Sequence, residues 1–139
     1  YSGNPLSCAV GLAVLNYAQN RGLVKRAACM GAYLFEKLSS LADLPMVGDI
    51  RGKGLLMSIE LVKDKEKKTP FERHRKVSET IAERAFEKGL IIYPGSGTAD
   101  GIVGDHIIIS PPFIVTEIEI DTIFDLLQES ILEVQQSIM

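Results

Sequence analysis

The chain has 139 residues, of which 46% are apolar and 24% charged, and its formal net charge is −3. This length suits one domain with a sizeable core, and the apolar content argues against intrinsic disorder. No apolar run approaches the roughly 20 residues that span a bilayer, and there is no signal-peptide pattern. The only basic cluster lies at 63–68, which makes nucleic acid a poor candidate for a partner.

The cysteines and histidines do not form a recognisable metal motif. Cys8 and Cys29 fall within predicted helices, and we interpret them as reduced side chains that pack in the interior of a cytoplasmic protein. His74 and His106 are far apart in sequence and have no neighbouring Cys or His. The sequence therefore predicts no metal site.

The first predicted helix runs to Asn20, with Asn4 as its N-cap and Pro5 at its first position. It is apolar on almost every side, which is typical of a helix buried all round. Because a chain of this size offers little protein to enclose it, we expect a missing partner, either another domain or another subunit. The opening residues, Tyr1-Ser2-Gly3, include no initiator Met, so we expect a piece of a longer protein.

A second helix is predicted after Arg21-Gly22, ending before Leu44-Pro45, since the residue before proline avoids the helical region. Helical spacing places one apolar stripe on it. The stripe comprises Val24, Ala27, Ala28, Gly31, Leu34, Phe35, Leu38 and Leu41.

The segment from Val47 to Leu61 predicts a strand, a turn and a second strand. Met57, Ile59 and Leu61 alternate with polar residues, which indicates a half-buried strand. The lysine-rich stretch 63–70 is interpreted as a solvated loop. An amphipathic helix is then predicted from Phe71 to Lys88, with Gly89 as its C-terminal cap.

Two short apolar runs, Leu90–Tyr93 and His106–Ile109, flank a glycine-rich loop and predict two buried strands. The loop is too long for a tight hairpin turn, and loops of this kind on a rigid scaffold often carry function. The alternative is a plain connection between two core strands. After Pro111-Pro112, the sequence Thr116-Glu117-Ile118-Glu119 is a capping box that begins the last helix. Its apolar stripe is Ile120, Ile123, Phe124, Leu127, Ile131, Val134 and Ile138.

This order of elements predicts an α+β fold, with a small, mostly antiparallel sheet packed against helices. The sequence contains none of the common nucleotide-binding or nucleophile motifs that we tested: it has no complete GxGxxG, no Walker motif and no GxSxG elbow. It therefore shows no set of residues that could carry out catalysis without further protein. Arg51, in a glycine-flanked turn, is a candidate for binding a carboxylate or a structural turn residue. Tyr93 is a candidate for a pocket wall or a packed rim residue, and His106 begins a strand, where a structural role competes with a chemical one.

Three segments, in one order and spacing, resemble the class III aminotransferases. They are YSGNPLSCA (1–9), VGDIRGKGLLMSIELV (47–62), and GLIIYP followed by GDHIIISPPFIVTEIEID (89–94 and 104–121). The resemblance covers essentially the whole chain. It implies the C-terminal small domain of the type I aminotransferase fold, preceded by a buried interdomain helix. Residues 1–20 would belong to the junction with a missing large domain, and 21–139 would form the small domain.

The resemblance also implies chemistry with pyridoxal 5′-phosphate, in which an amino group passes from an amine or ω-amino acid to an oxo acid. In the family, a lysine that forms a Schiff base with this cofactor lies upstream of the YSGNP segment. None of the nine lysines here lies in a matching context. The resemblance therefore implies no catalytic residue, no bound cofactor and no activity in this chain alone.

Residue by residue, the resemblance places Tyr1, Ser2 and Gly3 beside the cofactor phosphate of the partner subunit in a homodimer. We take Arg51, Tyr93 and His106 as the candidate substrate-binding residues. Arg51 matches the family's RGxG turn, whose role the resemblance implies to be mainly architectural, with a share in substrate access. Many family members carry a carboxylate-binding Arg where Tyr93 or Ile108 stands, and this sequence has neither. An aminomutase of the same fold and a non-catalytic α+β interaction domain are the alternative hypotheses.

Overall fold

The computed structural model describes residues 3–138. Four helices and four strands follow one another along this part of the chain, with short 3₁₀ turns at Ser40–Asp43 and Arg73–Arg75. In order they are α1 (Pro5–Asn20), α2 (Leu23–Ser39), β1 (Val47–Lys53), β2 (Leu56–Leu61), α3 (Val77–Glu87), β3 (Tyr93–Gly95), β4 (Asp105–Ile109) and α4 (Glu117–Ile138). None of these helices is long and apolar enough to cross a membrane.

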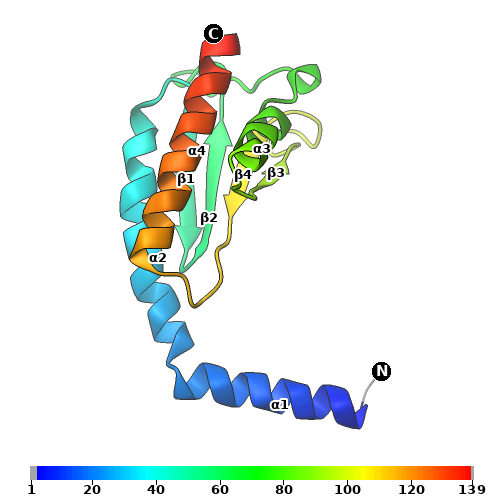
Figure 1. Ribbon diagram of the computed structural model, residues 1–139. Coiled ribbons are helices and arrows are strands. Elements are labelled where there is room, and N and C mark those ends of the chain that lie inside the picture. The colour runs from blue at the N-terminus through cyan, green and yellow to red at the C-terminus, as the bar shows by residue number, and fades with distance from the viewer. Residues whose placement is uncertain (1–2, 139) are drawn as a thin grey trace.

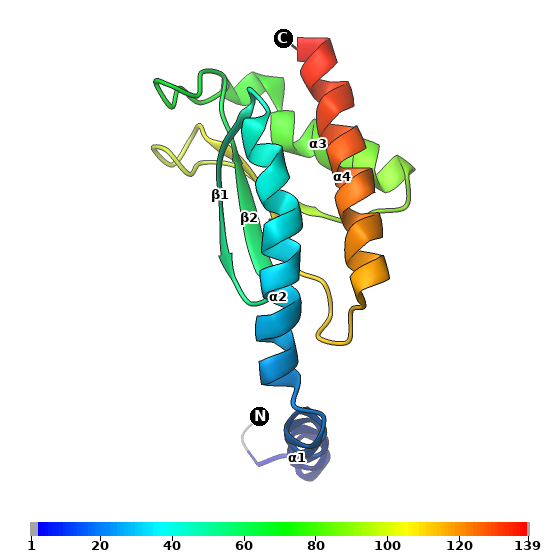
Figure 2. The ribbon, with the colours of Figure 1, turned by 90° about the vertical axis from the view of Figure 1, so that its left-hand side faces the viewer.

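The strands form one sheet in the order β1-β2-β4-β3, and every neighbouring pair is antiparallel. Helices α2 and α4 lie on the same side of this sheet, and α3 packs against α4 and the β3–β4 edge (Figures 1 and 2). The predicted α+β class with an antiparallel sheet is confirmed. Because the helices cover one face only, the other face of the sheet is open within the described chain.

The core lies between the helices and the covered face of the sheet. Alternate strand residues supply one side of it, because successive side chains of a strand point to opposite faces. These are Met57, Ile59 and Leu61 on β2 and Ile107 and Ile109 on β4, all at most 4% exposed. The helices supply the other side with Leu34, Leu38, Ile81, Ile120, Leu127 and Ile131, none of which is exposed. The predicted alternation of β2 and the predicted stripe of α4 are thus confirmed.

Helix α4 begins as the capping box predicts. The Thr116 backbone N–H and hydroxyl both donate to the Glu119 carboxylate at 2.8 Å, and the Glu119 N–H donates back to the Thr116 hydroxyl at 3.3 Å. At α1, the Asn4 side chain accepts from the Ser7 N–H at 3.1 Å, which confirms it as the N-cap.

Helix α2 begins where predicted but ends at Ser39, and a 3₁₀ turn covers the rest of the predicted span. The predicted stripe is partly wrong. Val24, Ala28 and Phe35 are exposed, while Leu23 and Met30 are buried in their place. Gly31, which lies on the predicted stripe, is buried where α2 closely approaches the β1–β2 turn, and a Cβ at this position would collide with the carbonyl group of Gly54.

The helix predicted at Phe71–Lys88 begins later than expected, at Val77. Lys76 adopts a left-handed conformation with φ of 49°, which separates α3 from the preceding 3₁₀ turn. Phe71 is buried in the core from an extended segment rather than from a helix. The C-terminal end matches the prediction: Gly89 has φ of 90°, and the Leu90 N–H donates to the Ala85 carbonyl at 2.8 Å.

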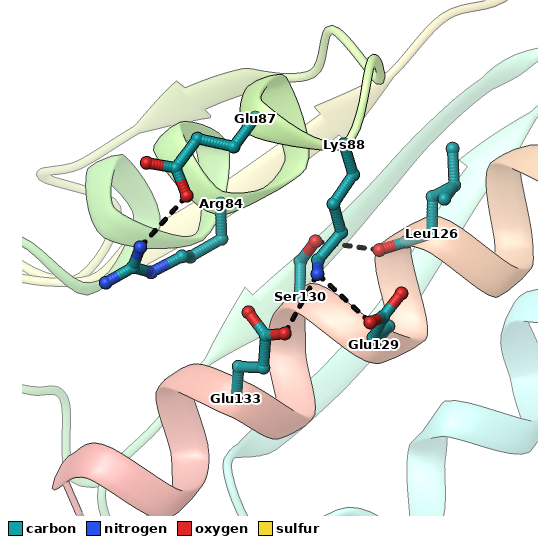
Figure 3. A network of polar contacts seen from close by, with 7 residues as sticks. All are labelled: Arg84, Glu87, Lys88, Leu126, Glu129, Ser130 and Glu133. Carbon is teal, nitrogen blue, oxygen red and sulfur yellow. Dashed lines mark hydrogen bonds and ion pairs between the residues drawn. The ribbon is translucent and has the colours of Figure 1, made fainter.

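A charged network joins the end of α3 to α4 (Figure 3). The Lys88 ammonium lies 2.8 Å from the Glu133 carboxylate and 3.0 Å from that of Glu129. Hydrogen bonding to Glu133 and then Glu129 raises the pKa of Lys88 above its ordinary value. Lys88 thus links the end of α3 to α4 through two ion pairs.

The apolar run Leu90–Tyr93 does not form the predicted strand. Leu90 and Ile92 are buried, but ladder pairing begins only at Tyr93 and covers Tyr93–Gly95. The strand is short and lies at the sheet edge, where Pro94, which has no N–H to donate, is tolerated. The second run forms β4 as predicted, one residue longer at its start.

Helix α1 projects from the start of α2 and lies away from the sheet and the other helices (Figure 1). No residue of α1 is buried. Cys8 and Cys29 are both free and helical, as predicted, but the prediction that they are packed in the interior is wrong for the chain by itself. Cys8 lies on the uncovered α1, and Cys29 lies on the outer side of α2, so both thiols are exposed.

Candidate functional site

The open face of the sheet brings together residues that are distant in sequence. Arg51 pairs with Ser58 across β1 and β2, Ser58 pairs with Ile108 across β2 and β4, and Ile108 pairs with Tyr93 across β4 and β3. Residues that face each other in an antiparallel ladder project to the same side. Arg51 and Tyr93 therefore mark the two ends of one row that crosses the whole open face.

A second row runs beside the first and consists of Asp49, Glu60, His106 and Gly95. Arg51 of the first row is joined to this second row, because its guanidinium forms ion pairs with Asp49 and, at 3.1 Å, with Glu60. Hydrogen bonding first to Asp49 and then to Glu60 raises the pKa of Arg51. The positive charge of Arg51 is thus matched by two carboxylates of its own sheet.

His106 occupies the middle of the second row and is half-buried. Its Nδ1 atom is inaccessible to solvent and has no hydrogen-bond partner within residues 3–138. The backbone of Gly95 lies directly over the imidazole, and a Cβ at position 95 would collide with the ring. The close contact between Gly95 and His106 therefore requires glycine at the end of β3.

Tyr93 begins β3, rather than ending a strand as the sequence predicted, and its side chain is 69% exposed. It shares the open face with Ile108, its ladder partner. The two positions at which the family resemblance led us to look for an arginine are therefore neighbours on this face. An aromatic and an aliphatic side chain make this part of the face apolar.

Between the two ends of the row lies a shallow cavity of about 320 Å³. Its wall is formed by the end of β1, the start of β2 and one residue of β4. The lining residues are Arg51, Gly52, Lys53, Leu56, Met57, Ser58 and Ile108. The open face is thus hollowed beside Arg51, with an apolar floor and a basic rim.

A buried polar contact behind the open face fixes the position of β3, and sequence reasoning did not find it. Asp105, 1% exposed, accepts hydrogen bonds from the Ser78 backbone N–H at 3.2 Å and from the Ser78 hydroxyl at 2.9 Å. The same hydroxyl lies 3.0 Å from the carbonyl oxygen of Gly95. One serine thus joins α3, β3 and β4. A serine next to the apolar positions Val77 and Ile81 of α3 is the sequence signal that could have found it.

The loop between β3 and β4 is ordered by its own hydrogen bonds. The Asp100 carboxylate accepts from the N–H groups of Ile102 and Val103, both at 2.8 Å, and these bonds lower its pKa. The Thr98 hydroxyl donates to the Gly104 carbonyl at 3.0 Å. The loop is a compact turn, and its place at the rim of an active site remains a prediction.

The predicted phosphate-side residues fall at the edge of the described chain. Tyr1 and Ser2 lie outside the described residues, and Gly3 is an exposed turn residue with φ of 83°. No group of three or more potential metal ligands occurs among residues 3–138.

The lysines do not fit a Schiff-base site. Seven of the nine are exposed; the other two, Lys37 and Lys88, are half-buried and form ion pairs with acidic side chains. A lysine nucleophile is activated by a lowered pKa, whereas hydrogen bonding to Asp121 raises that of Lys37 and hydrogen bonding to Glu133 raises that of Lys88. The described residues therefore do not form a complete site for a pyridoxal cofactor, and we derive no catalytic step within this chain.

Comparison with known proteins decides the family. Residues 1–131 match the family model described as aminotransferase class-III. The chain belongs to the class III aminotransferases. This family uses pyridoxal phosphate, and the predicted family membership is confirmed.

Relatives from three organisms show how much of such a protein is present. An uncharacterized aminotransferase of Schizosaccharomyces pombe is 42% identical over 132 residues, which are 94% of this chain and 29% of the relative. The aminotransferase YodT of Bacillus subtilis is 34% identical over 99% of this chain and 31% of the relative. The PMP-bound aminotransferase from Vibrio fluvialis superposes with a TM-score of 0.89 at 33% identity, covering 99% of this chain and 28% of that one. The chain thus spans about three-tenths of the length of its class III relatives.

Proposed function

We propose that this chain is the C-terminal part of a pyridoxal-phosphate-dependent aminotransferase that passes an amino group from an amine or ω-amino acid to an oxo acid. The observation that carries the proposal is that nearly all of this chain matches class III relatives, over 28–31% of the length of each relative. The lysine environments support it as well, because the Schiff-base lysine must come from elsewhere in the enzyme. The chain alone is then inactive and binds no cofactor.

In this proposal, residues 1–20 belong to the junction with a large domain, and residues 21–139 form the small domain. The large domain supplies the cofactor lysine, and a homodimer brings Tyr1, Ser2 and Gly3 beside the phosphate held in the partner subunit. The projecting and uncovered α1 supports a junction role for the first twenty residues. The cofactor, when bound in the intact enzyme, supplies the carbonyl chemistry.

The open face of the sheet is proposed to be the side that faces the substrate. Tyr93 and Ile108 provide apolar contact to the donor or acceptor, and His106 supports the wall beside them. Arg51 is engaged by Asp49 and Glu60, so its contribution is to hold the hollow in shape and to leave a basic rim rather than to present a free carboxylate-binding group. Apolar contact at Tyr93 favours substrates with an apolar body beside the reacting amine.

A fusion tests the proposed function. In this fusion, called the Vibrio fusion below, our chain replaces the matched segment of the Vibrio fluvialis aminotransferase. We expect it to consume a primary amine in the presence of an oxo acid and pyridoxal phosphate, and we expect Tyr93→Ala to raise KM more than it lowers kcat, because it removes binding surface. The Vibrio fluvialis protein truncated before the matched segment is the control. A folded, cofactor-loaded Vibrio fusion with no more activity than that control would overturn the proposal.

A further inference from the structure

The open face of the sheet has a third row beside the two described above. Lys53 pairs with Leu56 across β1 and β2, two residues along from the pair of Arg51 and Ser58. Because strand residues two apart project to the same side, Lys53 and Leu56 share the open face with Arg51. Both are exposed, and both line the hollow of about 320 Å³ beside Arg51. The hollow therefore has two basic side chains, one from each of two neighbouring rows.

The two basic side chains differ in what surrounds them. The guanidinium of Arg51 is paired with the carboxylates of Asp49 and Glu60. Lys53 forms no ion pair and no side-chain hydrogen bond within residues 3–138. It borders the hollow beside Arg51 and a second hollow of about 310 Å³ between α2 and the end of β1, and no acidic residue of the described chain lines either one. Of the two cations, Lys53 is thus the one that is open to an anionic ligand.

Ser58 adds a hydrogen-bond donor to the same hollow. It is half-buried and lies in the first row between Arg51 and Ile108, and its hydroxyl has no hydrogen-bond partner among residues 3–138. The other side chains of the lining, Leu56, Met57 and Ile108, are apolar. An ammonium and a hydroxyl both donate to a carboxylate, and ligand sites typically combine a few such polar groups with an apolar wall. The hollow therefore suits a small ligand with one carboxylate and a short apolar body.

The charges of the open face give such a ligand one orientation. Arg51 together with Asp49 and Glu60 carries a net negative charge, and these two carboxylates lie in the second row. Lys53 lies on the other side of Arg51, in the third row. A carboxylate is therefore repelled from the second row and attracted to Lys53, while its apolar body lies along the row that leads to Ile108.

The geometry points to Lys53, with the Ser58 hydroxyl beside it, as the group that binds the carboxylate of the oxo-acid acceptor. This assignment deepens the proposed function and rests on it. The two positions at which many family members carry a carboxylate-binding arginine hold Tyr93 and Ile108, and the charge of Arg51 is already matched. Lys53 orients the acceptor and takes no part in the transfer of the amino group. The ligand class is a monocarboxylic oxo acid with a short apolar tail.

Kinetics of the Vibrio fusion with a charged and an uncharged acceptor test this assignment. The acceptors are 2-oxobutyrate and butanal, of which only the first has a carboxylate, and the amine is held fixed. We expect Lys53→Gln to raise the KM for 2-oxobutyrate about five-fold, as the loss of an ion pair open to solvent would, and to leave the KM for butanal and both kcat values unchanged. Ser58→Ala should have a smaller effect of the same kind. Lys53→Arg keeps the positive charge and should hold the KM for 2-oxobutyrate within about two-fold of the unsubstituted fusion.

Lys68→Gln is the matched control for Lys53→Gln. It removes the same charge from an exposed lysine that lies in the 63–70 loop, outside the open face, and it should leave the KM of both acceptors unchanged. An active Vibrio fusion in which Lys53→Gln changes the KM of both acceptors equally, or changes neither, would overturn the assignment. It would leave the proposed function standing, because the fusion would still transfer the amino group.

A titration of the chain itself with 2-oxobutyrate, followed by NMR, decides the assignment where the Vibrio fusion is inactive. We expect the backbone amides of 51–58 to shift saturably in the unsubstituted chain and in Lys68→Gln, but not in Lys53→Gln. That result beside an inactive, cofactor-loaded fusion would refute the proposed function and leave the carboxylate site standing. Shifts that are absent from the three chains, or equal in them, beside an inactive fusion would overturn the carboxylate site as well.

Discussion

Replacing Asp105 by alanine is expected to lower the free energy of unfolding by about 3 kcal/mol. The carboxylate is buried and accepts from both the backbone N–H and the hydroxyl of Ser78. Leaving a buried donor without its partner costs about 1–3 kcal/mol, and alanine would leave the Ser78 backbone N–H without an acceptor at a fully buried site, which places the loss towards the upper end. The Ser78 hydroxyl can still donate to the Gly95 carbonyl, which lies 3.0 Å away. The loss would loosen the joint between α3, β3 and β4. Urea denaturation followed by circular dichroism measures the change.

The control for Asp105 is Asp100, which lies in a loop turn rather than at a joint in the core: it is exposed and accepts only from its own loop. Asp100→Ala should therefore cost far less than Asp105→Ala. Equal losses for the two variants would contradict a special role for the buried joint. Asp105→Asn, which keeps an acceptor oxygen for Ser78, should recover much of the lost stability.

The second large effect is expected at Gly31. A Cβ there would collide with the Gly54 carbonyl, so α2 and the β1–β2 turn would have to move apart. Overpacking of this kind costs about 1–3 kcal/mol, and the clash with rigid backbone places Gly31→Ala towards the upper end even after the gain of about 1 kcal/mol in helix propensity. The shift would also deform the hollow beside Arg51, because Gly52 and Lys53, which line it, lie at the end of β1 that leads into this turn.

Gly11→Ala is the matched control for Gly31→Ala. Gly11 also lies within a helix, but a Cβ at that position has no heavy atom within 4 Å. The substitution should leave the unfolding of the α2–α4 domain unchanged and should slightly favour α1. Thermal unfolding of the two variants, measured side by side, separates the steric effect from helix propensity. Equal melting temperatures would show that the close approach at Gly31 does not matter.

Much of the fold follows from local patterns in the sequence. The alternation of β2, the stripe of α4, the capping box at Thr116 and the N-cap at Asn4 each depend on neighbouring residues, and each is confirmed. The errors lie where an unusual backbone conformation or a tertiary contact overrides the local pattern. Lys76 takes a left-handed conformation that delays α3, and Tyr93 starts a strand only because β4 is there to pair with it.

The candidate site was harder to predict from the sequence than the fold, because it depends on strand register. Arg51, Tyr93 and His106 could be chosen from sequence, but the two rows that join them appear only when four strands are aligned. The ion pair of Arg51 with Glu60 is likewise a cross-strand contact, and the hydrogen bonds by which Ser78 joins Asp105 to Gly95 are long-range contacts. The exposure of Cys8 shows the same limit, since an apolar helix implies burial without saying what buries it.

Our central claim is that this chain belongs to an aminotransferase whose cofactor lysine lies outside it. The most direct measurement is borohydride reduction in the presence of pyridoxal phosphate, followed by peptide mass spectrometry, on the isolated chain and on the Vibrio fusion. We predict no near-stoichiometric pyridoxyl adduct on any of the nine lysines of this chain in either sample, and one adduct on a lysine of the Vibrio fluvialis part in the fusion. A stoichiometric adduct on a single lysine of this chain would contradict the claim.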